Sequence, residues 1–206
     1  MLEFYFDISS PWTYLAFHNI QPIAKEAGVA IRWKPILVGG IFNTVNPSVY
    51  EFRKHGSPGK HRYLVKDLGD WARHTGLEIR FPPSIFPINS VKAMRACIVL
   101  DPEGRLPDFA KAAFEAYWGR DEDISSDDVL AAVCRTAGVD AQRVMAGIGE
   151  QAVKDELRRN TDELIERGGF GSPTIFVGRE DMYFGNDRLH FVRDALRTAQ
   201  GQGRRG

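Results

Sequence analysis

Residues 2–14 read LEFYFDISSPWTY and join two patterns within a short distance. Leu2 to Asp7 alternates aromatic and acidic residues, which predicts a short strand that ends in a turn. Pro11 then occupies a position where the first turn of a helix tolerates proline, with Ser9 or Ser10 placed to cap that helix. The stretch therefore predicts a strand that passes through a hydroxyl-bearing turn into a helix.

The two ends of the chain predict strands. The first helix is expected to run to Ala27, where Gly28 stops it, and residues 29–35 (VAIRWKP) predict a second strand. A strand-helix-strand order favours a parallel pair with a right-handed crossover. Near the other end, two short strands are expected over 174–177 and 182–184, before a closing helix over 188–198.

A long helical region separates these ends. Residues 37–58 are rich in Gly, Asn, Pro and Ser and predict loops. An apolar stripe at helical spacing follows, formed by Tyr63, Leu64, Leu68, Trp71 and Ala72. After a proline-rich break over 81–87, helices are expected over 90–100, 107–117, 126–137, 140–147 and 151–167. The sequence therefore predicts one α/β domain, β-α-β … β-β-α, interrupted by a helical insertion.

Composition excludes several classes of protein. The 206 residues carry 27 Lys plus Arg and 27 Asp plus Glu, so the net charge is zero and nucleic acid is not an expected partner. No apolar run approaches the roughly 20 residues that cross a bilayer, so no membrane partner is expected. The first residues lack the features of an export signal, which predicts a cytoplasmic protein. Residues 201–206 (GQGRRG) are expected to form a disordered tail.

The two cysteines predict no chemistry of their own. Cys97 and Cys134 show neither a disulfide framework nor metal-ligand spacing. Both are expected to be small buried residues on helices, and no metal site is expected.

Ser10 is the first candidate for chemistry. A hydroxyl between a strand and a helix N-terminus lies where free N–H groups and the helix dipole stabilise a negative charge. A serine there does not ionise readily, but it can donate a hydrogen bond to a thiolate that arrives with a ligand. The alternative is a simple helix cap, and the residues alone leave both open.

A second motif combines glycine and proline. Residues 168–174 read GGFGSPT and place Pro173 at the entry to a predicted strand. This favours a tight turn and a cis peptide, where the residue before the proline can pair through its backbone with an extended peptide. An ordinary loop is the alternative.

A third motif precedes the closing helix. Residues 185–188 read GNDR, and Asn186 or Asp187 is a suitable cap for that helix. The alternative is capture of an amino-acid head group, in which Asp187 pairs with an ammonium and the helix N–H groups receive a carboxylate.

The three motifs together resemble one family. The stretches FYFDISSPWTYLA (4–16), GSPT (171–174) and FGNDRL (184–189) are similar to those of 2-hydroxychromene-2-carboxylate isomerases. These enzymes are bacterial relatives of the kappa-class glutathione transferases in the DsbA-like thioredoxin superfamily. Redox members carry Cys-Pro-x-Cys where this chain has Ser10-Pro11-Trp12-Thr13, so dithiol exchange is not expected.

The resemblance covers nearly the whole chain and implies its domain organisation. The expected fold is α/β, with a thioredoxin-like core over 1–36 and 168–200 and an α-helical insertion over 37–167. The active site is expected in the cleft between them.

The resemblance also implies site residues. Ser10 corresponds to the catalytic serine, which hydrogen-bonds the glutathione sulfur and favours its thiolate. The residues expected to bind glutathione are Ser10, Ser172, Pro173, Asn186, Asp187 and Arg188. In this set the Ser172 backbone pairs with the cysteinyl unit, and residues 186–188 hold the γ-glutamyl end. Candidates for the glycine carboxylate or the substrate pocket are Asn46, Lys60, Asn89, Trp12 and Phe42.

The implied function is glutathione-dependent isomerisation of 2-hydroxychromene-2-carboxylate-type intermediates of aromatic degradation. The thiolate adds to the conjugated system, the ring opens and rotates about a single bond, and elimination regenerates glutathione. Two alternatives stay open: a kappa-like glutathione transferase or peroxidase that uses the same Ser10, and a non-catalytic binding protein on a thioredoxin fold. The expected partners are glutathione and a small aromatic substrate, and a homodimer is a further expectation.

Overall fold

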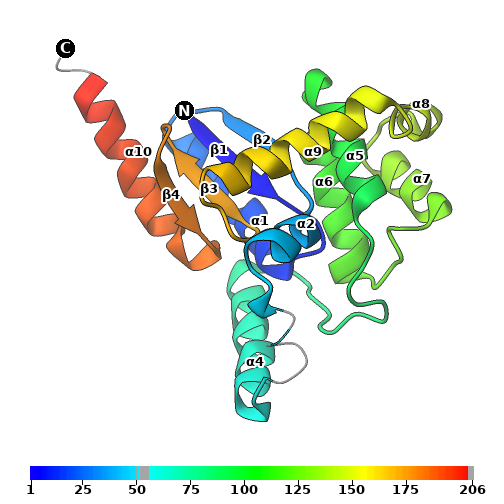
Figure 1. Ribbon diagram of the computed structural model, residues 1–206, viewed down its shortest axis with the longest axis horizontal. Helices are drawn as coiled ribbons and strands as arrows, with labels where there is room; N and C mark the ends of the chain where they lie inside the picture. Colours follow the sequence, from blue (N-terminus) through cyan, green and yellow to red (C-terminus); the bar gives the residue numbers. More distant parts are fainter. Residues whose placement is uncertain (50, 52–55, 204–206) are drawn as a thin grey trace.

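The computed structural model describes residues 1–49, 51 and 56–203, and these contain a four-stranded sheet covered by helices (Figure 1). The strand order is β2 (Ile31–Pro35), β1 (Leu2–Phe6), β3 (Thr174–Val177) and β4 (Asp181–Phe184). β1 and β2 are parallel, as predicted, with α1 (Pro11–Glu26) between them in the chain. β3 pairs antiparallel with both β1 and β4, so the two ends of the chain form one sheet.

The register of the strands brings the three sequence motifs to one edge of this sheet. Tyr5 of β1 lies opposite Thr174 of β3, and Thr174 lies opposite Phe184 of β4. The residues that follow β1, precede β3 and follow β4 therefore leave the sheet side by side. These are the positions of the serine-proline turn, the GGFGSPT stretch and the GNDR stretch.

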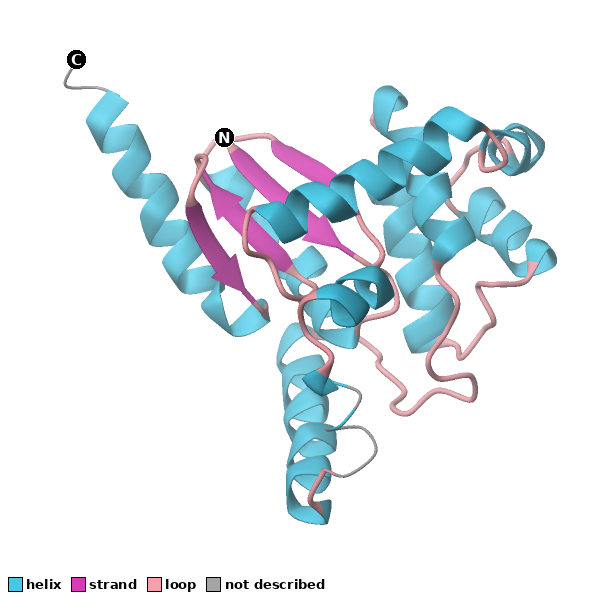
Figure 2. Ribbon diagram, in the orientation of Figure 1, coloured by secondary structure: helices cyan, strands magenta, loops and turns pink. Residues whose placement is uncertain are grey.

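Alternating side chains of β1 face two layers of helices, as the two-residue period of a strand requires. Phe4 and Phe6 belong to the larger core, which includes α1 and α10 (Leu189–Gly203) and continues into the insertion. Tyr5 belongs to the second core with Ile41 of α2 (Val38–Thr44) and Leu164 of α9 (Gln151–Glu166). Figure 2 shows α2 and α9 in front of the sheet. Full burial of each phenylalanine contributes about 1.5–3 kcal/mol.

A network of charged side chains fastens α9 to the sheet. Glu163 accepts hydrogen bonds from Lys34 Nζ at 2.8 Å and from the Tyr5 hydroxyl at 2.7 Å. Arg167 donates to Glu3 at 2.8 Å and to the Tyr5 oxygen at 2.7 Å. Burial, the largest single influence on Glu163, raises its pKa, but the bonds from Lys34 and Tyr5 and the charges of Lys34 and Arg167 together lower the pKa overall. The network thus anchors the end of α9, from which the GGFGSPT stretch departs.

The insertion and the closing segment consist mainly of helices. They are α4 (Pro58–Thr75), α5 (Val91–Leu100), α6 (Leu106–Phe114), α7 (Asp127–Thr136) and α8 (Ala141–Gly147), with the short turns η1 (Asp101–Glu103), η2 (Glu115–Gly119, a π-helical turn) and η3 (Asn186–Arg188). The sequence predicted α5 to α9 to within a few residues and a helical stripe within α4, and the proline-rich break over 81–87 is irregular as predicted. In the described ranges, the structure has no helix long and apolar enough to cross a membrane.

The prediction of loops throughout 37–58 was wrong, because α2 lies within this range. Ile41 is fully buried in the second core, and the Asp7 carboxylate accepts the N–H of Val38 in the first turn at 2.9 Å. Packing and this acceptor therefore outweigh Gly39 and Gly40, which lower the intrinsic helix propensity.

Two other predictions were only partly right. Along the apolar stripe of α4, Leu68 and Ala72 are buried, whereas Tyr63 is 64% exposed. The first half of α4 projects from the body of the molecule (Figure 1), so the stripe is covered only near its end. The predicted tail begins inside α10, which continues to Gly203, and residues 204–206 lie outside the described residues.

Candidate active site

Ser10 lies between β1 and α1 and has two hydrogen-bonding roles. Its backbone is extended (φ −109°, ψ 123°), and its Oγ accepts the N–H of Thr13 at 3.2 Å, which caps α1. The same hydroxyl donates to the backbone carbonyl of Ser172 at 3.2 Å. The cap uses a lone pair of the oxygen and leaves its hydrogen for an acceptor, so the two interpretations of Ser10 are compatible.

The start of α1 also presents an unused backbone donor. Pro11 occupies the first helical position and has no N–H. The N–H of Trp12 has no acceptor in the described part of the chain. A negative charge beside Ser10 would therefore meet this N–H and the positive end of the α1 dipole.

The Ser172–Pro173 peptide is cis, as the GGFGSPT stretch predicted. Ser172 Oγ accepts the N–H of Asp7 at 2.9 Å and shares a hydrogen bond with Thr13 Oγ1 at 2.8 Å. The Ser172 N–H has no acceptor among the described residues. Ser172 therefore has a carbonyl held by Ser10, a side chain held on two sides, and an unused N–H.

The third motif adjoins the second. The N–H of Gly185 donates to the carbonyl of Pro173 at 3.2 Å, and Asn186 Oδ1 accepts from Asn19 Nδ2 of α1 at 2.9 Å. The turn η3 opens the closing helix, with Gly185 (φ 92°) as its N-cap and no side-chain capping bond. The prediction that Asn186 or Asp187 caps this helix was therefore wrong.

Asn186 and Asp187 differ sharply in exposure. The Asn186 side chain is turned into the protein and only 4% of the residue is exposed. The Asp187 side chain is 54% exposed and forms an ion pair with Arg188. The charge that this motif offers to a ligand is therefore that of Asp187, whereas Asn186 offers its backbone.

Asp7 connects three helix beginnings and was not selected by the sequence analysis as a site residue. Its carboxylate accepts the N–H groups of Ser9 and Val38, each at 2.9 Å, and a hydrogen bond from Ser90 before α5. Its carbonyl accepts the N–H of Ser10 at 3.2 Å. Burial raises the pKa of Asp7, and the hydrogen bonds offset part of this rise. The signal in the sequence that could have identified Asp7 is its position within the stretch FYFDISSPWTYLA.

Three of the five tentative substrate residues lie in or beside the motifs. Asn46 Nδ2 donates to the carbonyl of Phe170, which precedes Ser172 by two residues, at 3.1 Å. Phe42 of α2 borders Gly171, where a Cβ atom would lie 3.9 Å from the phenylalanine ring. Trp12, in the first turn of α1, is half-buried.

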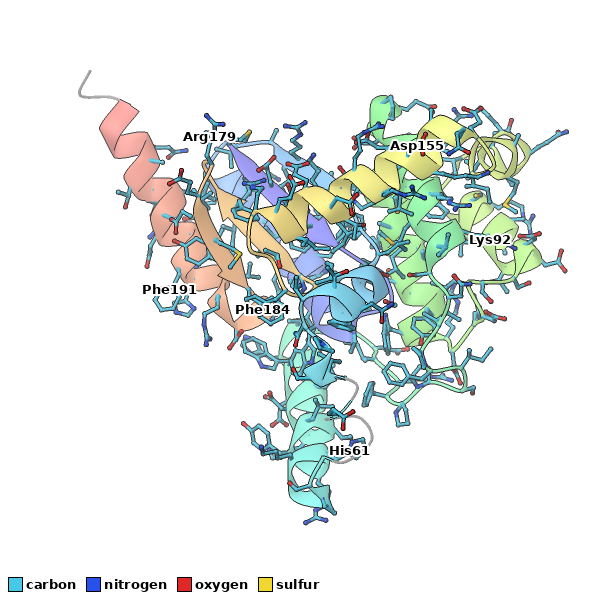
Figure 3. All side chains as sticks on the ribbon, viewed as in Figure 1. His61, Lys92, Asp155, Arg179, Phe184 and Phe191 are labelled. Carbon is cyan, nitrogen blue, oxygen red and sulfur yellow. The ribbon has the colours of Figure 1, made fainter. Side chains whose placement is uncertain are left out.

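Two others lie apart from this group. Asn89 is exposed, and its Oδ1 accepts the N–H of Val91 at 3.1 Å, which serves the first turn of α5. Lys60 is exposed in the first turn of α4, next to His61, which Figure 3 places toward the end of α4 that projects from the sheet. The structure does not bring Asn89 or Lys60 into contact with the three motifs.

An aromatic pair at the same edge was missed by the sequence analysis. The rings of Phe170 and Phe184 lie 4.6 Å apart and are 40% and 39% exposed. The Phe184 ring packs on Gly171, where a Cβ atom would approach it to 2.8 Å. Figure 3 shows Phe184 at the edge of the sheet near α2. The pair gives this edge an apolar surface.

A surface hollow of about 220 Å³ lies elsewhere, between α6, η2 and α7. Its lining residues are Asp108, Lys111, Ala112, Glu115, Thr136 and Ala137. Lys111 and Glu115 pair with each other at 2.8 Å, and no lining residue belongs to the three motifs. The hollow is therefore separate from the candidate site.

Comparison with known proteins agrees with this arrangement. The profile of the DsbA-like thioredoxin domain matches residues 1–197. A 2-hydroxychromene-2-carboxylate isomerase of Pseudomonas sp. (strain C18) is 30% identical over 209 residues, 98% of this chain and 93% of the relative. Glutathione S-transferase kappa 1 of Caenorhabditis elegans is 25% identical and covers 97% of this chain and 92% of its own.

A solved structure supports the same assignment. A selenomethionine 2-hydroxychromene-2-carboxylate isomerase has a TM-score of 0.83 and 28% identity, with 98% of this chain and 97% of that chain covered. The family profile and the relative at 30% identity each span nearly the whole chain. The chain therefore belongs to the DsbA-like thioredoxin family and, within it, to the group of the 2-hydroxychromene-2-carboxylate isomerases.

Proposed function

We propose that this enzyme is a glutathione-dependent isomerase of 2-hydroxychromene-2-carboxylate-type intermediates in aromatic degradation. The observation that carries the proposal is the Ser10 hydroxyl, which lies at the N-terminus of α1 and donates to the carbonyl before a cis proline. A serine at this position has no thiol for redox exchange, so the sulfur must come from a bound ligand.

The sulfur side of the site fits a thiol ligand. Ser10 offers a hydroxyl hydrogen, and Trp12 offers an unused backbone N–H. The unused N–H of Ser172 suits the backbone carbonyl of a cysteinyl unit. Cys97 and Cys134 are both buried, and burial raises the pKa of both thiols, so neither offers a competing thiolate.

The other side of the site fits an amino-acid head group. The exposed carboxylate of Asp187 suits the ammonium of a γ-glutamyl unit. Arg188 and the backbone N–H groups of η3 suit its carboxylate. Asn186 contributes its backbone there, because its side chain is buried, with Oδ1 bound to Asn19. Asn46, beside Phe170, is the candidate for the glycine carboxylate.

The catalytic role of the chain is to favour and hold a thiolate. When bound, glutathione supplies the nucleophile that adds reversibly to the conjugated substrate. The Ser10 hydroxyl hydrogen, which donates to the Ser172 carbonyl in this structure, turns to the sulfur, and the oxygen keeps accepting the Thr13 N–H. The α1 dipole and the Trp12 N–H stabilise the same negative charge. Ser10 therefore acts by electrostatic stabilisation, without attacking carbon itself.

The aromatic part of the substrate has an apolar surface beside these groups. Trp12 and Phe42 are its predicted walls, and the Phe170–Phe184 pair extends the wall along the sheet edge. Stacking on such rings contributes about 0.5–1.5 kcal/mol beyond area burial.

A kappa-like glutathione transferase is the second candidate, and the similarity to the kappa relative favours it. A steady-state assay on chromene carboxylates, with and without glutathione, separates the two functions. Isomerisation that needs glutathione and consumes none supports the isomerase. Net consumption of glutathione supports the transferase. A chain that binds no glutathione contradicts both.

A further inference from the structure

We infer that Thr13 is a positioning residue of this site, which holds Ser172 so that its unused backbone N–H is in place for the cysteinyl unit of glutathione. The inference rests on the proposed glutathione chemistry and adds to it a residue that touches neither glutathione nor substrate.

A closed ring of hydrogen bonds carries the inference. The Thr13 N–H donates to Ser10 Oγ at 3.2 Å, and Ser10 Oγ donates to the Ser172 carbonyl at 3.2 Å. Ser172 Oγ shares a hydrogen bond with Thr13 Oγ1 at 2.8 Å, which closes the ring. Asp7 braces the ring, because its N–H donates to Ser172 Oγ at 2.9 Å and its carbonyl accepts the Ser10 N–H at 3.2 Å.

The ring fixes a peptide plane as well as a side chain. Ser172 Oγ is held by Asp7 on one side and by Thr13 on the other. The carbonyl that receives the Ser10 hydroxyl belongs to the same residue. Fixing the side chain of Ser172 at two points therefore limits the orientation of the Ser172 backbone, including the N–H that has no acceptor among the described residues.

Burial makes the Thr13 hydroxyl hard to replace. Thr13 is 0% exposed and Ser172 is 7% exposed, so water has little access to the bond between their oxygens. Without the Thr13 hydroxyl, Ser172 Oγ keeps one partner and the Ser172 backbone is held less firmly. Glutathione would then meet a Ser172 N–H with several orientations, and ordering this N–H costs affinity and rate.

The test compares Thr13→Val with Thr13→Ser. Valine keeps the shape of threonine and removes the hydroxyl, whereas serine keeps the hydroxyl and removes a methyl group. We expect Thr13→Val to weaken glutathione binding and to lower kcat/KM by about twofold to tenfold, the range of one neutral hydrogen bond. Thr13→Ser should recover most of this loss. Thr75→Val is the control, since Thr75 Oγ1 donates to Trp71 within α4 and should alter stability without altering affinity.

A double-mutant cycle tests whether Thr13 acts through Ser172. We expect Thr13→Val to have almost no further effect on glutathione affinity once Ser172→Ala is present, because residues in one network are not additive. Additive losses would overturn the inference. A Thr13→Val protein with a lower Tm but wild-type affinity and pH profile would also overturn it. If the valine variant does not fold, Thr13→Ala replaces it in the same cycle.

The outcomes separate this inference from the proposed function. A wild-type chain that binds glutathione and isomerises substrate, with a Thr13→Val variant that does both equally well, removes the role of Thr13 alone. A wild-type chain with no affinity for glutathione removes the proposed function, and the role of Thr13 with it.

Discussion

Ser10 Oγ and the carbonyl oxygen of Ser172 lie 3.2 Å apart, although 162 positions separate the two residues in the chain. The contact follows from the sheet, because β1 and β3 are antiparallel neighbours and the residues after β1 meet those before β3. The same hydroxyl oxygen also caps α1. An experiment on Ser10 must therefore separate loss of a cap from loss of a donor.

Ser10→Ala is expected to reduce turnover far more than it weakens glutathione binding. The lost hydrogen bond acts on the thiolate, and removal of one such donor typically lowers the rate by about 10²–10³-fold. Loss of the cap should also lower the free energy of unfolding by about 1 kcal/mol. Steady-state kinetics, calorimetric titration and urea unfolding on one variant measure the three effects.

Ser57→Ala is the matched control for the cap. Ser57 Oγ accepts the N–H of Lys60 at 3.3 Å and caps α4 in the same way. Its removal should lower stability by a similar amount and leave turnover at the wild-type value. If Ser10→Ala also keeps nearly full activity, Ser10 is a helix cap and the proposed mechanism fails.

The native cysteines should be dispensable for activity. Cys97 and Cys134 are buried on helices, and burial raises the pKa of each thiol. A Cys97→Ala, Cys134→Ala double variant is expected to lose about 1–3 kcal/mol of stability through packing and to keep its turnover. Kinetics and urea unfolding check both statements. A folded but inactive double variant would show that a sulfur of the chain takes part.

Asp7 should make the free energy of unfolding decrease as pH rises, which is opposite to the usual effect of a paired carboxylate. Burial raises its pKa above the ordinary value of 3.8, so between 3.8 and its folded pKa the native state binds more protons than the unfolded state. Its contribution to stability is complete below pH 3.8 and declines as pH rises toward the folded pKa. Asp7→Asn has no carboxyl group at this position, so the decline in stability that Asp7 causes should be absent from the variant.

Unfolding of both proteins between pH 4 and 8 tests the role of Asp7. Asparagine accepts one of the two N–H groups and presents a donor to the other, so a cost of about 1–3 kcal/mol is expected near pH 4. The difference between wild type and variant should shrink as pH rises. Parallel curves would show that Asp7 does not titrate with a raised pKa. Asp70→Asn is the control, since bonds from Lys66 lower the pKa of Asp70 below 3.8, so the difference between wild type and this variant should change little between pH 4 and 8.

Local patterns predicted the strands and most helices because each is a periodic run between clear breaks. Pro11 after a short strand predicted the start of α1, and the GGFGSPT stretch predicted the cis bond before Pro173. α2 was not predicted, because contacts with distant parts of the chain stabilise it. Ile41 of α2 is buried in the second core, and the Asp7 carboxylate accepts the N–H of Val38. The content of Gly, Asn, Pro and Ser over 37–58 indicated loops there.

Candidate site residues were predicted where they lie in motifs and missed where tertiary contacts define them. Ser10, Ser172 and Asp187 stand in stretches whose residue types indicate chemistry. Thr13 gives no such signal, since its role depends on a hydroxyl of a residue 159 positions away. Phe184 is likewise defined by its contact with Phe170 across the loop and not by its neighbours in sequence.

Asp187→Asn separates ligand capture from structure. No side chain caps η3, so the exchange removes no capping bond. It does remove the ion pair with Arg188, but exposed pairs contribute only about 0–1 kcal/mol. The melting temperature should therefore stay nearly unchanged. Asparagine lacks the charge that a γ-glutamyl ammonium needs, and a charge-assisted bond is roughly twice as strong as a neutral one.

Glutathione binding by Asp187→Asn is therefore expected to weaken by about 1–3 kcal/mol, measured by calorimetric titration beside a melting curve of the same protein. The matched control is Asp70→Asn, an exposed carboxylate on α4 that is paired with Lys66 and Arg73. This exchange removes an equal charge away from the three motifs, so affinity should not change. Equal affinity of all three proteins would mean that the Asp187 charge does not meet the ligand, and the head-group site would then have to lie elsewhere. Weaker binding by Asp187→Asn alone would place the ammonium beside η3, because that variant differs from its control only in where the charge is lost.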